Sequence, residues 1–180
     1  MQGYGHPKFL PALRQYLRDN RPDVVDLIEP RISGAKVDFI IASIGFPHSY
    51  RIEAAGYPGG LWLCWYNYVT VDILANHFQF LHFRINCISD GSSSLATLIY
   101  ASPNASKIRC LWSHLGLLAA NINQPCLLSG DFNATLSTDD RMGCAPSTKP
   151  CPLFRKFLFD YGLRDMGFSG PNFTWHHGCA

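Results

Sequence analysis

The sequence predicts a single domain of the mixed α+β class, and two patterns carry this prediction. Short apolar segments follow one another between residues 61 and 100 at a spacing of roughly 8 to 12 residues, as in antiparallel meanders. Segments with apolar residues at helical spacing lie before and after this run, without the strict strand–helix alternation of a Rossmann fold. At 180 residues, the chain is long enough for one sizeable core.

The first part of the chain is predicted to begin with a helix and then to change to strands. Residues 7–20 carry apolar side chains at positions i, i+4, i+7 and i+8 from Phe9, which gives the helix one apolar face. Residues 23–28 form a short apolar strand. Residues 39–42 are a further strand candidate, whereas residues 45–55 are polar and predict an irregular loop.

The remaining elements alternate between strands and amphipathic helices. Strands of the central run are expected at residues 61–65, 69–74, 78–86 and 96–100. A second amphipathic helix covers residues 106–121, with Ser106 as its N-cap, and a strand at residues 125–129 follows it. Residues 152–161 form a third helix, and Gly162 is placed to end it as the C′ residue.

Composition and charge set broad bounds on the function. Apolar residues make up 47% of the chain and charged residues only 16%, which excludes a disordered tail. The net charge of +2 permits binding to a phosphate backbone without arguing for it. Seven cysteines without a Cys-x-x-Cys pair indicate reduced core residues, not a zinc site. No apolar run approaches the roughly 18 residues of a membrane span, so no membrane partner is expected.

Three predicted strands end in side chains that suit phosphate chemistry. The strand at residues 125–129 leads into Asp131 and Asn133, which flank Phe132. Because side chains alternate along an extended chain, these two side chains are expected to point to the same side. Two other strands end at Glu29 and at Tyr100. Each ending alone is typical of ordinary turns. Together they predict an active site, because rigid strand ends that meet loops commonly carry functional groups.

In order and spacing, these motifs resemble the endonuclease/exonuclease/phosphatase (DNase I-like) superfamily, and more narrowly the endonuclease domain of plant LINE-type (non-LTR) retrotransposons. The resemblance rests on residues 3–5, 21–29, 59–62, 100–104, 129–133 and 167–175. It implies a four-layer α/β/β/α sandwich of two mostly antiparallel sheets. It also implies hydrolysis of DNA phosphodiester bonds with Mg²⁺ (or Mn²⁺), a linked reverse transcriptase as a partner, and an intracellular protein whose compartment, the nucleus included, stays open.

The resemblance also implies a role for each candidate residue. Glu29 is the expected metal ligand, because Mg²⁺ prefers carboxylate oxygen and needs only one or two protein carboxylates. Asp131 would orient or activate the attacking water, and Asn133 would bind that water or a phosphate oxygen. Tyr100 would donate its hydroxyl to the phosphate as charge builds in the transition state. The candidates for substrate binding are Asn104 and Trp175, with core packing as the alternative for Trp175.

Two parts of the family pattern do not occur in this sequence. The family opens with a strand that ends in Trp-Asn-Cys, and it closes with strands that carry an Asp and a Ser-Asp-His stretch. We therefore expect one incomplete domain over residues 1–180, without the first strand and the C-terminal strands, and with impaired turnover. Two alternatives stay open: a catalytically dead fragment of such a domain, or a superfamily phosphoesterase that acts on a small phosphorylated substrate.

Overall fold

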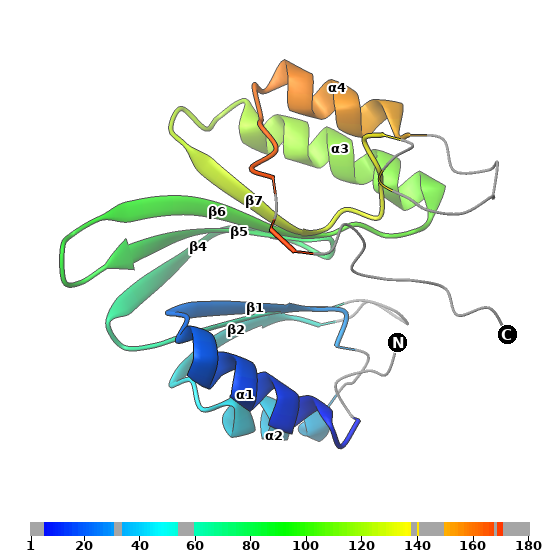
Figure 1. Ribbon diagram of the computed structural model, residues 1–180. Coiled ribbons are helices and arrows are strands. Elements are labelled where there is room, and N and C mark those ends of the chain that lie inside the picture. The colour runs from blue at the N-terminus through cyan, green and yellow to red at the C-terminus, as the bar shows by residue number, and fades with distance from the viewer. Residues whose placement is uncertain are drawn as a thin grey trace, which may run out of the picture. The chain divides into compact units, whose positions relative to one another are not determined.

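The computed structural model describes residues 6–30, 34–53, 60–137, 140, 150–167 and 169–170. Its elements in chain order are α1 (Phe9–Asn20), β1 (Val24–Ile28), α2 (Ala35–Ile44), β2 (His48–Ile52), β3 (Leu61–Trp65), β4 (Val69–His77), β5 (Phe80–Cys87), β6 (Ser93–Tyr100), α3 (Ala105–Ala119), β7 (Cys126–Asp131) and α4 (Pro152–Asp160) (Figure 1). The mixed α+β class predicted from the sequence is confirmed. The chain divides into two compact units, one of Met1–Ser102 with Gln124–Asp131 and one of Pro103–Asn123 with Phe132–Ala180.

A three-stranded antiparallel sheet in the first unit has the strand order β1-β3-β2. Two sequence predictions fail here. Residues 39–42, a strand candidate, lie inside α2, because Val37, Ile40 and Ile44 repeat with the helical period and are buried. Residues 45–55, predicted as a loop, contain β2, an edge strand whose sequence His-Ser-Tyr-Arg-Ile is too polar to show an apolar alternation.

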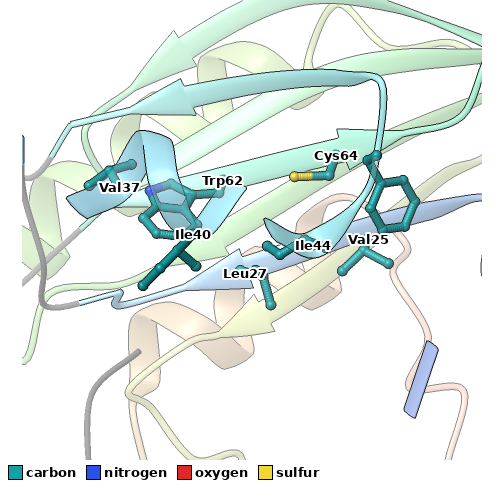
Figure 2. Close-up of a cluster of buried hydrophobic side chains, with 8 residues drawn as sticks. Val25, Leu27, Val37, Ile40, Ile44, Trp62 and Cys64 are labelled. Carbon is teal, nitrogen blue, oxygen red and sulfur yellow. The ribbon is translucent and has the colours of Figure 1, made fainter. Parts of the chain in front are cut away.

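One face of this sheet packs against the two N-terminal helices. Figure 2 shows the buried side chains of β1, β3 and α2 that meet there: Val25, Leu27, Val37, Ile40, Ile44, Trp62 and Cys64. Helix α1 adds a half-buried apolar face through Phe9, Leu13 and Leu17, as its sequence predicts. Tyr16, which the spacing also places on that face, is instead 58% exposed. Each fully buried aliphatic or aromatic side chain contributes about 1.5–3 kcal/mol to folding.

A four-stranded sheet in the same unit has the order β4-β5-β6-β7. Of the four strands predicted as one antiparallel meander, β4, β5 and β6 form it, whereas β3 belongs to the three-stranded sheet. Strand β7 pairs parallel to β6. Parallel pairing requires a long crossover connection, and helix α3 supplies it between these two strands. The two sheets share an apolar cluster in which Leu61 and Leu63 of β3 meet Leu81 and Phe83 of β5.

In the second unit, α3 and α4 pack through aromatic rings. Trp112 of α3 lies 5.0 Å from Phe154 and 5.5 Å from Phe157 of α4, measured between ring centroids. Gly162 ends α4 as the sequence predicts: its φ is +62°, and the two N–H groups of Gly162 and Leu163 bond back to carbonyls of the last turn. No helix among the described residues is long and apolar enough to cross a bilayer.

His82 is a titratable side chain buried in the four-stranded sheet. It lies between Leu81 and Phe83 on β5, and side chains alternate along a strand, so His82 faces away from the cluster between the sheets. Its Nδ1 lies 2.9 Å from the Thr97 hydroxyl on β6. Burial lowers the pKa of His82 below the ordinary 6.5; the backbone at Ala96 opposes this shift, and Arg84 adds to it.

We expect the free energy of unfolding to fall as the pH drops below about 6.5, because the unfolded chain takes up a proton at His82 that the folded chain binds only at lower pH. His82→Gln keeps a hydrogen-bonding partner for Thr97 but cannot titrate, so its stability should depend less on pH. Urea unfolding between pH 5 and pH 8 measures both proteins. His114→Gln, on the exposed side of α3, is the matched control. An unchanged pH dependence in His82→Gln would refute this account of His82.

Candidate active site

The tips of β6 and β7 place two candidate residues side by side. The two strands run parallel, and their register pairs Ile99 with Gly130 and Tyr100 with Asp131. Directly beyond the last pair, the Ala101 N–H donates to the Asp131 carbonyl over 2.8 Å. Tyr100 is 5% exposed and belongs to the cluster between the sheets, whereas Asp131 is exposed to solvent. A rigid, buried phenol and a solvent-accessible carboxylate thus occupy neighbouring strand ends.

Gly130 is required at the position that delivers Asp131. Its φ is +127°, a conformation that side-chain-bearing residues rarely adopt. A Cβ at this position would lie 1.9 Å from the Ile99 carbonyl oxygen, which is a backbone atom of the neighbouring strand. The glycine therefore both permits the turn and lets β6 and β7 approach each other.

Glu29 directly follows β1 and is held in an unfavourable backbone conformation. Its φ is +53°, although glutamate seldom adopts left-handed values and the following Pro30 disfavours helical backbone before it. The Glu29 N–H donates to the Gly60 carbonyl over 3.1 Å. Ile28, one residue earlier, packs against the cluster that contains Tyr100. In Figure 1, β1, β6 and β7 end toward the same side of their unit.

Asn133 shows the same backbone feature, with a φ of +44°. Among the described non-glycine residues, only Arg21, Glu29 and Asn133 have positive φ, and Arg21 is explained as the C-cap of α1. Left-handed backbone costs on the order of 1–3 kcal/mol at a residue such as glutamate and is often found at functional sites, whereas asparagine adopts it readily in turns. Of the residues selected from the sequence for their chemistry, Glu29 therefore bears this cost without a helix end to explain it.

Phe132, between the two polar candidates, is an anchor that the sequence analysis did not identify. Its ring lies 4.8 Å from Phe154 at an interplanar angle of 18°, and 6.5 Å from Trp112 at 2°. Aromatic pairs of this kind contribute about 0.5–1.5 kcal/mol beyond the burial of their area. The polar–aromatic–polar order of residues 131–133 could have indicated this role, since an aromatic side chain between two polar residues needs a packing partner.

Asn104 caps helix α3, which corrects the assignment of the N-cap to Ser106. The Asn104 side-chain oxygen accepts from the Ser106 N–H at 3.0 Å, the Lys107 N–H at 3.3 Å and the Ser106 hydroxyl at 2.6 Å. A contact with phosphate would therefore have to use its amide nitrogen, and this role stays a prediction. The other substrate-binding candidate, Trp175, lies outside the described residues, as does the Gly3-Tyr4-Gly5 motif.

The chemistry of the candidate ligands fits a hard divalent cation. Within the part of the chain that the structure describes, no group of three His, Cys, Asp or Glu side chains could hold a metal ion by itself. Mg²⁺ does not need such a group, because it keeps several waters and binds proteins through one or two carboxylates. The Glu29 carboxylate offers oxygen donors of this kind, which suit Mg²⁺ or Mn²⁺ better than a soft metal.

Comparison with solved structures shows the fold. An AP endonuclease from Leishmania major matches with a TM-score of 0.61 at 14% identity, over 86% of this chain and 62% of that one. The human Nocturnin catalytic domain with bound sulfate matches with a TM-score of 0.52 at 13% identity, over 74% of this chain and 60% of that one. The chain thus has a DNase I-like fold and spans about three fifths of these structures. No protein-family profile and no curated protein sequence matches it.

Proposed function

We propose that this domain hydrolyses phosphodiester bonds with the help of a divalent metal ion. The observation that carries the proposal is the pairing of Tyr100 with Asp131 at the tips of two parallel strands, next to a glycine whose Cβ would clash with the neighbouring strand. A second support is the left-handed backbone at Glu29, since strained backbone of this kind clusters at functional sites.

The proposed reaction gives each residue one task. The Asp131 carboxylate orients the attacking water and accepts its proton as the water oxygen bonds to phosphorus. Asn133 holds that water or a non-bridging phosphate oxygen by a hydrogen bond. The Tyr100 hydroxyl donates to the phosphate oxygen on which negative charge increases while the bond to the leaving oxygen breaks. Glu29 would hold the cation, which when bound neutralises charge on the phosphate.

DNA is the proposed substrate. The support is the resemblance of the sequence to retrotransposon endonucleases, together with a structural neighbour that is an AP endonuclease. The same resemblance is the sole support for the finer assignment, which is a retroelement-type endonuclease that nicks target DNA for a linked reverse transcriptase. Asn104 and Trp175 are the side chains proposed to contact the DNA strand.

Nicking of supercoiled plasmid tests the proposal. We expect cleavage in Mg²⁺ or Mn²⁺ that EDTA stops, and a decrease of about 10²-fold in Tyr100→Phe, which loses only the donating hydroxyl. Tyr16→Phe, on the exposed side of α1, is the matched control and should cleave like the wild type. Absence of metal-dependent cleavage in the wild-type protein, or equal rates in the two variants, would contradict the proposed function.

A further inference from the structure

Gln79 is a buried polar residue in an unusual place. Strands β4 and β5 are joined by Phe78 and Gln79, because His77 still pairs with Phe80. Side chains in such tight turns normally face water, and Phe78 is 39% exposed, but Gln79 is only 1% exposed. A carboxamide that is taken out of water costs several kcal/mol unless its polar atoms find partners. The position therefore calls for specific contacts.

Those contacts reach the strand tip that carries Tyr100. The Tyr100 N–H donates to the Gln79 backbone carbonyl over 2.8 Å. The Ser102 N–H donates to the Gln79 side-chain Oε1 over 2.7 Å. The Gln79 N–H in turn donates to Nδ1 of His77 over 3.3 Å. One residue of the turn thus binds two alternate N–H groups of the segment that leaves β6.

The N–H between those two groups is bound from the other side. Ala101 donates to the Asp131 carbonyl, so the three successive N–H groups of Tyr100, Ala101 and Ser102 alternate between Gln79 and Asp131. Strand β5 begins only at Phe80, so the Gln79 side chain stands in for a backbone carbonyl where the ladder between β5 and β6 has ended. Hydrogen bonds therefore hold the backbone at and after Tyr100 from two sides, through Asp131 of β7 and through Gln79 of the β4–β5 turn.

We propose that Gln79 is a positioning residue of this site, which holds the end of β6 so that the Tyr100 hydroxyl keeps its place relative to Asp131. This inference rests on the proposed function. Hydrolysis requires the Tyr100 hydroxyl to be placed accurately, because a displacement of roughly 1 Å in a catalytic group costs on the order of 10²-fold in rate. We assign the control of this placement to Gln79, which does not itself contact the substrate. Neither the composition of the turn nor the sequence motifs single out Gln79.

Gln79→Met tests the proposal, because methionine keeps the length and the apolar contacts but removes the acceptor for Ser102. We expect faster hydrogen exchange of the Ser102 amide by NMR and a kcat for plasmid nicking lower by roughly 10-fold or more, with KM nearly unchanged. Gln15→Met, on the exposed surface of α1, is the matched control.

The two readouts separate the possible failures. A faster Ser102 exchange with wild-type kcat, measured well below the melting temperature, would overturn the positioning role and leave the proposed function intact. A Ser102 exchange rate that does not change in Gln79→Met would show that the side chain does not hold the loop. Absence of metal-dependent nicking in the wild-type protein would overturn the proposed function, and the positioning role with it.

Discussion

Gly130→Ala is expected to destabilise the domain by roughly 3 kcal/mol or more, enough to remove much of the stability of a typical domain. The new methyl group would lie 1.9 Å from the Ile99 carbonyl oxygen, so β7 would have to move away from β6. The left-handed φ of +127° adds a second cost. Because Asp131 is the next residue, the same movement would displace the proposed catalytic carboxylate from Tyr100.

Urea unfolding followed by circular dichroism measures this effect. Gly91→Ala is the matched control, because Gly91 also has a positive φ, of +69°, but a Cβ there would meet no atom within 4 Å. The control should therefore lose only the free energy that left-handed backbone costs an alanine, about 1–2 kcal/mol. Equal losses of stability in the two variants would show that the approach of β6 to β7 at Gly130 is not as close as described.

Asp131→Asn should lower the rate of plasmid nicking by about 10²–10⁴-fold, the range that a positioned acid or base contributes. The amide has the size of the carboxylate but cannot accept a proton from water at neutral pH. The side chain is exposed to solvent, and its residue is tied into the structure by the backbone carbonyl that Ala101 binds. The melting temperature of each protein, measured alongside the rate, shows whether a loss of cleavage occurs in the folded protein.

Asp19→Asn is the control for this prediction. Asp19 is an exposed carboxylate of α1 that accepts a hydrogen bond from Gln15, and it has no part in the proposed site. It should cleave at the wild-type rate. If Asp131→Asn retains the wild-type rate while both proteins are folded, Asp131 does not activate the water, and the proposed roles must be reassigned.

Much of the fold follows from local patterns in the sequence. Strands β3 to β6 and helix α3 were predicted within a few residues, because each has a continuous apolar pattern of its own. The wrong predictions concern short segments whose own residues do not reveal the element to which they belong. The run Phe39–Ile40–Ile41 looks like a strand until Val37 and Ile44 extend the helical period. Strand β2 has polar residues along an edge and therefore no apolar signature.

In the candidate site, the chemically reactive residues could be selected from the sequence, but the residues that hold them in place could not. Glu29, Tyr100 and Asp131 could be selected from the sequence because their residue types and strand-end positions suit phosphate chemistry, although their roles remain proposals. The residues that support them could not. Gln79 is separated by 23 positions from the Ser102 amide that it binds, and Phe132 meets rings from two different helices. Such partners are set by tertiary packing, which local pattern does not contain.

Binding of Mn²⁺, followed by the electron paramagnetic resonance signal of the free ion, tests the central claim most directly because it does not depend on turnover. We predict that the wild-type protein binds the ion and that Glu29→Gln loses this binding, because an amide oxygen is a much weaker ligand than a carboxylate. Glu53→Gln, at an exposed glutamate that pairs with Arg51, is the control and should bind like the wild type. Equal binding by Glu29→Gln and Glu53→Gln, or no binding by the wild-type protein, would contradict a metal site at Glu29.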